Sequence, residues 1–515
     1  MSKKRKNKIS VYLIKDSLTD YSEIVVDEYA GSQDVDIGKI FFGKSFQKKP
    51  VWADKFLENV LSDDLFTANA RAVLIVPINK DDTIRFFAIV MGYGRSLLRD
   101  GGIEERFGLK TILNTIQPDS LRRINKTNLG SSQKISYEQL PTPSNVSAFG
   151  FDVEQDLVSR ISGLSNDDNF IKGIIEGDSI LSFSTEDSLS TIKPLLEKIL
   201  NRYLLDNYKQ DFEWVDNLCP IKDKIVISQL NDKLIEEINN NSENIYMACP
   251  DILDWSDFQS FEICNKEYNY ISADNFNDAV GEKIANLEQL KSYKISYISA
   301  ENGQKVKSWN AYKCVGGEIE FNNKIYCLNN GKWYCIDDGY KNNIENFYNA
   351  VPISNIDFIP YSQSSYTTEK EYNISFATQN NYFDLDAQLI SYGGGHSKIE
   401  LCDILTPNTD MIHIKKYSSS SVMSHLFMQG LVSRELIKSD NEFLQKANEK
   451  LYELNIDLSF DRTKQIKVIY GIITNKEDSG RPHLPFFSKV ALKNTIKRLN
   501  TLDVVVELKA IKITD

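Results

Sequence analysis

The sequence predicts a multidomain α+β protein whose last third is an α/β domain with a mixed sheet. Three observations lead to this prediction. The chain has 515 residues, which is too long for one hydrophobic core and corresponds to about two to four domains. Strand-like alternation and helical periodicity occur along its whole length. After residue 366 the predicted elements follow the order α-β-β-β-α-(α)-β-α-β, which is compatible with one sheet covered on both faces.

The first predicted domain, residues 1–215, is also α/β. The apolar and β-branched segments expected to form strands are 8–15, 71–79 and 84–92. The segments with helical periodicity are 52–61, 153–165 and 185–212. The last of these is expected to bend at Pro194, because proline disrupts the interior of a helix. The polar stretch 128–147 is predicted to be a surface loop.

The second predicted domain, residues 216–365, contains a β-meander over 309–340 with Asn-Asn and Asn-Gly turns. Its aromatic residues Trp309, Tyr326, Trp333 and Tyr334 are expected to form a packing face. The hairpin turn at Asn330-Gly331 would place Cys327 opposite Tyr334 and Cys335 opposite Tyr326, so the two thiols would point to opposite faces. No CxxC motif occurs, and all seven cysteines are predicted to be free.

The charge balance and hydropathy limit the class of protein. A net charge of −12 argues against a protein that coats nucleic acid without specificity. Basic residues do cluster at Lys3, Lys4, Arg5 and Lys6, and again where Lys489, Lys493 and Lys497 form a stripe on one helix face beside Arg498. That stripe is either a nucleic-acid contact or a solvated helix face. The chain has no apolar run of membrane-spanning length and no signal-peptide pattern, so a cytoplasmic protein with no membrane partner is expected.

The third predicted domain, residues 366–515, contains an unusually polar stretch, "KIELCDILTPNTDMIHIKKYSSSSVMSHLFMQG" (398–430). In its first strand, Asp403 interrupts a row of apolar residues. In its second, His413 and Lys415 share one face, about 6.5–7 Å apart. Burying an acid among apolar side chains costs several kcal/mol unless a cation, a hydrogen-bond donor or a metal compensates. Asp403 therefore needs a partner, and the neighbouring strand offers an imidazole and an ammonium.

The helix that follows adds further polar groups. Ser421, His425 and Gln429 recur at i, i+4 and i+8 and should lie on one face, beside the core face. The serines at 418–421, Ser419 among them, are natural helix N-caps. Gly430 in the middle of the helix costs about 1 kcal/mol relative to alanine, which indicates close packing or a local break.

An acid on one strand, a polar-x-Lys step on the next and then a polar helix resembles the site of restriction-endonuclease-like enzymes. The resemblance implies a divalent metal, Mg²⁺ or Mn²⁺, bound by Asp403, His413 and Glu400. Lys415 would be the catalytic cation, with His425 and Gln429 as supporting groups. His413 stands where the superfamily usually has an acid, which would favour Mn²⁺. The carboxylates that could replace the missing acid are Glu400, Glu371, Asp384 and Asp386. The expected contacts to DNA or RNA are Lys416, Ser419, Lys489, Lys493 and Lys497.

A second resemblance covers nearly the whole chain. The segments that carry it, in order, are "FGLKTILN", "FGFDVEQDLV", "CLNNGKWYCIDD", "EKEYN", "IELCDIL", "IHIKKY" and "SHLFMQG". They look like a sporadically distributed bacterial family of unknown function found in mobile-element and defence gene neighbourhoods. The chain departs from the family's usual leucine and valine choices in "CDIL" and "HIK". The resemblance implies a role against phages or foreign DNA, with a phage-derived trigger as a partner, but it assigns no chemistry.

Three other interpretations remain open at this stage. The polar cluster could be a buried ion-pair network of Asp403 with Lys415 or His425. It could belong to a non-catalytic sensor or scaffold that binds nucleic acid, a nucleotide or a phage protein. A serine hydrolase using Ser424 or Ser419 is a third possibility, although the chain has no GxSxG motif. The sequence leaves the oligomeric state open.

Overall fold

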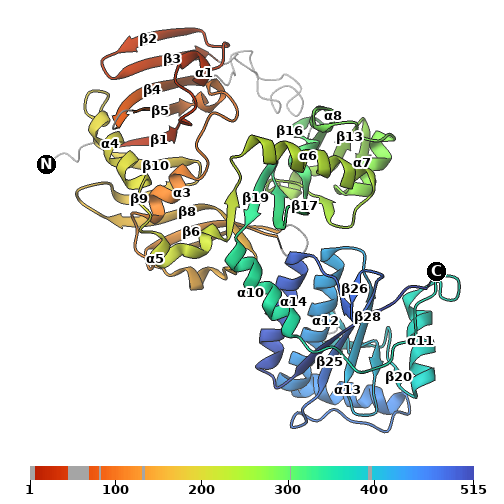
Figure 1. Ribbon diagram of the computed structural model, residues 1–515. Coiled ribbons are helices and arrows are strands. Elements are labelled where there is room, and N and C mark those ends of the chain that lie inside the picture. The colour runs from red at the N-terminus through yellow and green to blue at the C-terminus, as the bar shows by residue number, and fades with distance from the viewer. Residues whose placement is uncertain are drawn as a thin grey trace, which may run out of the picture.

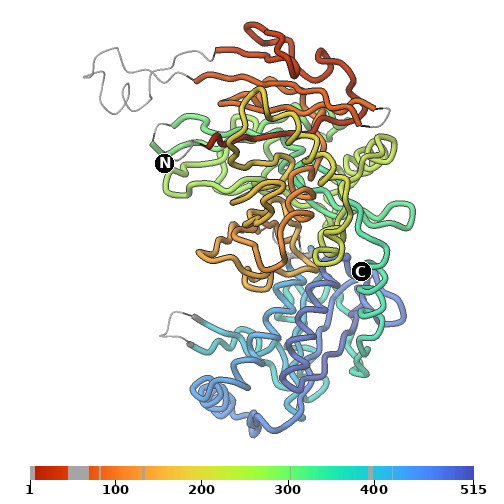
Figure 2. Tube along the Cα trace, turned by 90° about the vertical axis from the view of Figure 1, so that its left-hand side faces the viewer, coloured from red at the N-terminus to blue at the C-terminus, as the bar shows by residue number. Residues whose placement is uncertain are grey.

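The computed structural model describes residues 6–44, 69–80, 83–129, 134–301, 303–392 and 397–514. These residues form an α/β protein with a large antiparallel sheet near the N-terminus, two smaller sheets in the middle and a mixed sheet near the C-terminus. The N-terminal sheet and the C-terminal domain lie at opposite ends of the molecule, with the middle region beside them (Figures 1 and 2). The helix predicted over 52–61 and the residues Lys3, Lys4 and Arg5 lie outside the described residues.

The N-terminal sheet has the order β2-β3-β4-β5-β1-β10-β9-β8-β6-β7, and each neighbouring pair is antiparallel. Helices α3 (Phe107–Leu113) and α4 (Ile192–Tyr203) pack against the sheet and share its main core. The predicted strands 8–15, 71–79 and 84–92 are confirmed as β1, β4 and β5. The strands are β1 (Asn7–Leu13), β2 (Gly31–Val35), β3 (Gly38–Lys44), β4 (Ala70–Lys80), β5 (Thr83–Gly92), β6 (Leu121–Asn128), β7 (Lys134–Ser144), β8 (Asp156–Asn166), β9 (Lys172–Gly177) and β10 (Ile180–Thr185).

Two predictions in this region are wrong. The segment 153–165, predicted to be helical, contains strand β8. A shift of register against β6 leaves Ser159 without a partner residue, and this β-bulge breaks the period-two pattern of the strand. The segment 128–147, predicted to be a loop, contains the edge strand β7, which pairs only with β6. An edge strand tolerates proline and polar side chains, so its composition resembles that of a loop.

The helical prediction over 185–212 is confirmed in part. The segment forms α4 and the short α5 (Lys209–Phe212), separated by a turn rather than joined in one long helix. Pro194 lies in the first turn of α4, where no backbone N–H is needed for an intrahelical hydrogen bond.

The middle region contains one five-stranded sheet, β11-β19-β18-β17-β12, and one four-stranded sheet, β14-β13-β15-β16. Its strands are β11 (Leu218–Pro220), β12 (Ile245–Met247), β13 (Phe258–Ile263), β14 (Lys266–Tyr268), β15 (Lys294–Ser299), β16 (Lys305–Asn310), β17 (Val315–Phe321), β18 (Lys324–Asn329) and β19 (Lys332–Ile336). Its longer helices are α6 (Lys224–Asn239), α7 (Ala273–Val280) and α10 (Asp338–Ala350).

The predicted β-meander is confirmed, including its register. Cys327 pairs with Tyr334 and Tyr326 pairs with Cys335, as the Asn-Gly turn requires. Asn330 and Gly331 both have positive φ angles, of 48° and 70°. All seven cysteines are free thiols. The predicted beginning of the meander at residue 309 is wrong, because residues Ala311–Cys314 form the single-turn helix α9 between β16 and β17.

The C-terminal domain has a mixed five-stranded sheet in the order β20-β23-β24-β25-β28. The pairs β20-β23 and β23-β24 are antiparallel, whereas β24-β25 and β25-β28 are parallel. The predicted order of elements is confirmed except at three places: two predicted strands are each divided in two, and a short hairpin that was not predicted, β26-β27, lies between β25 and α14. The elements are α11 (Glu369–Asn380), β20 (Phe383–Asp384), β21 (Leu389–Tyr392), β22 (Ser397–Glu400), β23 (Ile404–Leu405), β24 (Met411–Lys416), α12 (Ser420–Ser439), α13 (Asn441–Glu453), β25 (Lys467–Ile473), β26 (Glu477–Asp478), β27 (Arg481–Pro482), α14 (Phe486–Asn500) and β28 (Val505–Ile511).

This C-terminal sheet is buried on both faces. On β25, Val468, Tyr470 and Ile472 belong to the core formed with α12, α13 and α14, whereas Ile469 and Ile473 belong to the core formed with α11. Helices α12 and α14 contact each other, and α11 contacts β24 from the other side (Figure 1). Among the described residues, no helix has the length and apolar character needed to cross a membrane.

Candidate functional site

Asp403 lies in the break between β22 and β23, with its carboxylate against the neighbouring strand β24. The carboxylate oxygen Oδ2 accepts a hydrogen bond from the backbone N–H of Ile414 at 2.6 Å. The Asp403 backbone is bonded on both sides, to Ile412 and to Leu385, which fixes the position of the side chain. Burial raises the pKa of Asp403 to about 8, although the hydrogen bond from Ile414 acts to lower it. The nearby acids Glu400 and Asp386 also act to raise the pKa.

Two more carboxylates face Asp403. Ligand oxygens of Asp386, Glu400 and Asp403 all lie within 4.8 Å of one another. Asp386 accepts a hydrogen bond from Asn373 Nδ2 on α11 at 3.2 Å, and Glu400 accepts one from the N–H of Ala387 at 2.7 Å. Burial raises the pKa of Glu400 as well. We call these three residues the acidic triad.

Lys415 on β24 lies beside the acidic triad but is bound by another acid. Its ammonium is 2.5 Å from Oε2 of Glu369, the first residue of α11, and Glu369 Oε1 accepts the N–H of Lys416 at 2.9 Å. Burial acts to lower the pKa of Lys415. The negative charges of Glu369, Asp403 and Asp386 have the larger combined effect, so the pKa of the lysine lies above its ordinary value. The Lys415 side chain is 39% exposed, so a substrate can reach it from solvent.

Helix α12 supplies the predicted helical groups. Gln429 Nε2 donates a hydrogen bond to Oε2 of Glu400 at 3.3 Å, which places this glutamine at the acidic triad. His425, one turn earlier, is exposed and stabilises the ionised form of Glu400. A Cβ atom on Gly430 would lie 2.6 Å from the hydroxyl of Tyr470, so the glycine permits close packing of α12 on the sheet, one of the two predicted alternatives.

His413 lies apart from the acidic triad. Its ring is buried against Tyr470, with 6.0 Å between ring centroids, in the core beneath α12. Burial lowers its pKa to about 3, so the imidazole is neutral, and its Nε2 has no hydrogen-bond partner among the described residues. In the described part of the chain, the group of residues that could hold a metal ion contains Asp386 in place of His413.

The residues predicted to contact nucleic acid lie in two places. Lys416 is the last residue of β24, and Ser419 precedes α12. Lys416 lies 5.6 Å from the Tyr361 ring centroid, and Ser419 caps α12 by accepting the N–H of Val422. Lys489 and Lys493 are buried on α14 and bind Glu345 and Glu154, respectively. Lys497, which is 54% exposed, is the member of the stripe that faces solvent.

Sequence reasoning missed two residues of this site, Glu369 and Asn373. Both lie on α11, in the segment "EKEYN", which was one of the seven segments that carried the whole-chain resemblance. Of the carboxylates weighed as substitutes for the missing acid, Asp386 and Glu400 lie in the triad. The Glu371 carboxylate instead accepts the backbone N–H of Thr367, just before α11. The Asp384 carboxylate accepts the N–H of Asp386.

The family model that matches this chain covers residues 9–512, nearly its whole length. The chain belongs to a family of unknown function (DUF6119). The expectation of an uncharacterised family that spans the whole chain is therefore confirmed. Neither a curated protein nor a solved structure matches the chain. The acidic triad and Lys415 lie within the region that the family model covers.

Proposed function

We propose that the C-terminal domain hydrolyses nucleic-acid phosphodiester bonds with the help of a divalent cation at the acidic triad. The observation that carries the proposal is the approach of Asp386, Glu400 and Asp403 to within 4.8 Å of one another, beside the partly exposed Lys415. At an effective dielectric constant of 20, two carboxylates this close repel each other by about 3–4 kcal/mol when both are ionised. An arrangement this costly is typical of sites that bind cations.

The residues present fit a hard cation. All three side chains of the triad offer oxygen ligands, which Mg²⁺ and Mn²⁺ prefer. Within the described residues, no member of the triad forms an ion pair with a lysine, arginine or histidine, since Lys415 pairs with Glu369 instead. This geometry argues against the purely structural interpretation, in which Asp403 and Lys415 neutralise each other. The buried Oδ1 of Asn373, next to Asp386, also has no hydrogen-bond partner in this part of the chain.

The side chains around the triad have distinct roles in this proposal. The cation, when bound, would polarise the scissile phosphate and lower the pKa of a bound water. Lys415 would offset charge on the phosphate and orient the attacking water, and Glu369 would hold the lysine in place. Gln429 would position Glu400, and His425 and Lys416 would contact the flanking phosphates of a substrate.

The test is a cleavage assay with purified protein, single- and double-stranded DNA and RNA, and Mg²⁺ or Mn²⁺. We expect cleavage that requires the metal and that falls at least 100-fold in the Asp403→Asn and Lys415→Ala variants. Asp384→Asn serves as a matched control, because this acid is near the site but outside the triad. Equal activity in all variants would refute the proposal.

Binding of nucleic acid without cleavage, unchanged by metal, would favour the alternative of a sensor or scaffold. The wider role in defence against phages or mobile elements, which the family resemblance implies, is part of our proposal. It predicts that expression of the chain with its native neighbouring genes reduces phage plaque formation. Lys415→Ala should abolish that protection if cleavage is its mechanism.

A further inference from the structure

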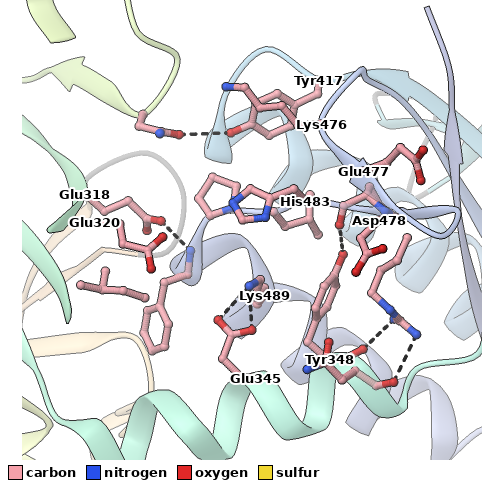
Figure 3. Close-up of a pocket in the computed structure, with 18 of the residues that line it drawn as sticks. Glu318, Glu320, Glu345, Tyr348, Tyr417, Lys476, Glu477, Asp478, His483 and Lys489 are labelled. Atoms are coloured by element: carbon pink, nitrogen blue, oxygen red, sulfur yellow. Dashed lines mark hydrogen bonds and ion pairs between the residues drawn. The ribbon is translucent and has the colours of Figure 1, made fainter. Parts of the chain in front are cut away.

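A cavity of about 770 Å³ lies between the middle region and the C-terminal domain. One wall comes from β17 and α10, and the other from the β26-β27 hairpin and the beginning of α14 (Figure 3). Neither the acidic triad nor Lys415 lines it, so the cavity is separate from the site described above. Its volume lies within the range of about 300–1,000 Å³ that is typical of small-molecule sites.

Most acids in the wall of this cavity already have partners. Both carboxylate oxygens of Glu345 lie 2.8 Å from the Lys489 ammonium. Glu318, on β17, accepts the first two backbone N–H groups of α14. Glu477 pairs with Lys512 at 3.1 Å. The negative charge on these three residues is therefore largely compensated within the chain.

Two nitrogen-bearing side chains in the wall, Lys476 and His483, have no such partner among the described residues. Among the described residues, the Lys476 ammonium has no ion pair or hydrogen bond, and the Glu243 carboxylate whose ionised form it stabilises lies beyond ion-pair distance. The His483 ring likewise makes no hydrogen bond in the described part of the chain. The backbone N–H of His483 donates to the Lys476 carbonyl at 2.7 Å, which holds the two residues side by side across the hairpin. Both side chains are exposed, and Figure 3 shows the His483 ring near the centre of the cavity.

We propose that this cavity binds a nucleotide, with its phosphate groups against Lys476 and His483. Ammonium and imidazole N–H groups are strong donors to phosphate oxygens. Around the same cavity, Glu320 and Asp478 have exposed carboxylates, which can accept hydrogen bonds from ribose hydroxyls and from an exocyclic amine. A nucleotide carries both kinds of group at the two ends of one molecule.

The position of the cavity suits an effector. Tyr417 lines it, two residues after Lys415 in the same chain segment, and its hydroxyl donates to Asn244 of the middle region at 3.4 Å. A bound nucleotide would therefore contact the middle region and the segment that follows the proposed catalytic lysine. This inference goes beyond the proposed nuclease function and does not depend on it.

Isothermal titration calorimetry with the full chain tests the proposal. ATP, ADP, adenosine and inorganic phosphate are titrated in the presence of EDTA, so that no metal bridges a nucleotide to the acidic triad. We expect ATP and ADP to bind and adenosine to bind at least 10-fold more weakly. The Lys476→Ala/His483→Ala variant should lose at least 10-fold in affinity for ATP. Lys464→Ala, at an exposed lysine outside the cavity, is the matched control and should bind as the wild type does.

Lys415→Ala should also bind ATP normally, which separates this inference from the nuclease proposal. Absence of ATP binding at millimolar concentration would overturn it, and so would unchanged affinity in the double variant. Inorganic phosphate binding as tightly as ATP would show a site for a simple anion and would also contradict it. Thermal unfolding of each variant checks the fold, and the two single variants replace the double variant if its melting temperature falls.

Discussion

The Lys415 ammonium lies 2.5 Å from one carboxylate oxygen of Glu369, and the other oxygen of that carboxylate accepts the backbone N–H of Lys416. A single acid at the start of α11 thus holds both the end of β24 and the lysine side chain that β24 presents. Because Lys415 pairs with Glu369, the three carboxylates of the acidic triad form no ion pair with a basic side chain among the described residues.

Replacing Glu369 by glutamine should impair cleavage without removing any ligand of the triad. Loss of an outer residue that orients a catalytic group typically costs about 10- to 100-fold. Glu369 also raises the pKa of Lys415, so the alkaline limb of the pH–rate profile should move to lower pH in Glu369→Gln. Glu371→Gln is the matched control, because Glu371 bonds to Thr367 and not to Lys415. An unshifted alkaline limb would contradict this positioning role.

The contribution of Asp403 to the stability of the metal-free protein should fall as the pH rises between 3.8 and about 8. Over that interval the folded state retains the proton of Asp403, whose pKa burial raises to about 8, whereas the unfolded state has lost it. The slope from one such group is at most about 1.4 kcal/mol per pH unit. His413, whose pKa burial lowers to about 3, has the opposite effect below pH 6.5, so the Asp403 contribution is measured as the difference between the wild type and Asp403→Asn in thermal unfolding at each pH. Mn²⁺ should restore stability at pH 8 in the wild type only. An identical slope of stability against pH in the wild type and in Asp403→Asn would show that Asp403 titrates normally.

Replacing Arg434 by leucine should stabilise the C-terminal domain. This arginine on α12 is fully buried, and its three guanidinium nitrogens have no hydrogen-bond partner among the described residues. Burial of a charged group without a partner costs several kcal/mol, and an apolar side chain of similar volume removes that cost. Thermal unfolding followed by circular dichroism measures the effect. Arg498→Leu, at an exposed ion pair with Glu435, is the control and should change stability by less than about 1 kcal/mol.

Two lysines of α14, Lys493 and Lys497, should contribute differently to the stability of the protein. Lys493 is buried and binds Glu154 and Asn343, so Lys493→Met should destabilise the protein by about 1–3 kcal/mol through the lost hydrogen bonds. Glu154 keeps a second cation, because the Lys497 ammonium lies 3.4 Å from the same carboxylate oxygen. Lys497 is largely exposed, and Lys497→Met should change stability by less than about 1 kcal/mol. If α14 contacts nucleic acid, Lys497→Met should weaken binding in a filter assay. Equal melting temperatures for the two variants would contradict the expected difference between the buried lysine and the exposed one.

Much of the C-terminal domain was predictable because its signals are local. The strands and helices there have clear apolar patterns, and the order of elements follows from them directly. The alternation of a strand also placed Lys415 near Asp403, since adjacent strands of a sheet lie about 4.8 Å apart. Gln429 was predictable for the same kind of reason, as helical periodicity set its face. The β8 strand was missed because its bulge removes the period-two pattern.

The partners of each charged group were not predictable in this way. From the sequence, Lys415 is an expected partner of Asp403, and Lys489 and Lys493 are expected either to contact nucleic acid or to lie on a solvated helix face. In the structure these lysines bind Glu369, Glu345 and Glu154, which lie 46, 144 and 339 positions away along the chain. Likewise, alternation placed His413 beside Lys415 but did not show that packing against Tyr470 separates its ring from the acidic triad.

By itself, the sequence determined the class of the elements, their order in the last third of the chain, the hairpin register around Cys327 and the membership of a family. Those properties depend on side-chain periodicity and turn residues, which act over a few positions. Only the tertiary structure decided which carboxylates meet, which lysines are neutralised and where a cavity remains. Charge compensation and packing act through space, and the chain brings their partners together only when its separate regions assemble.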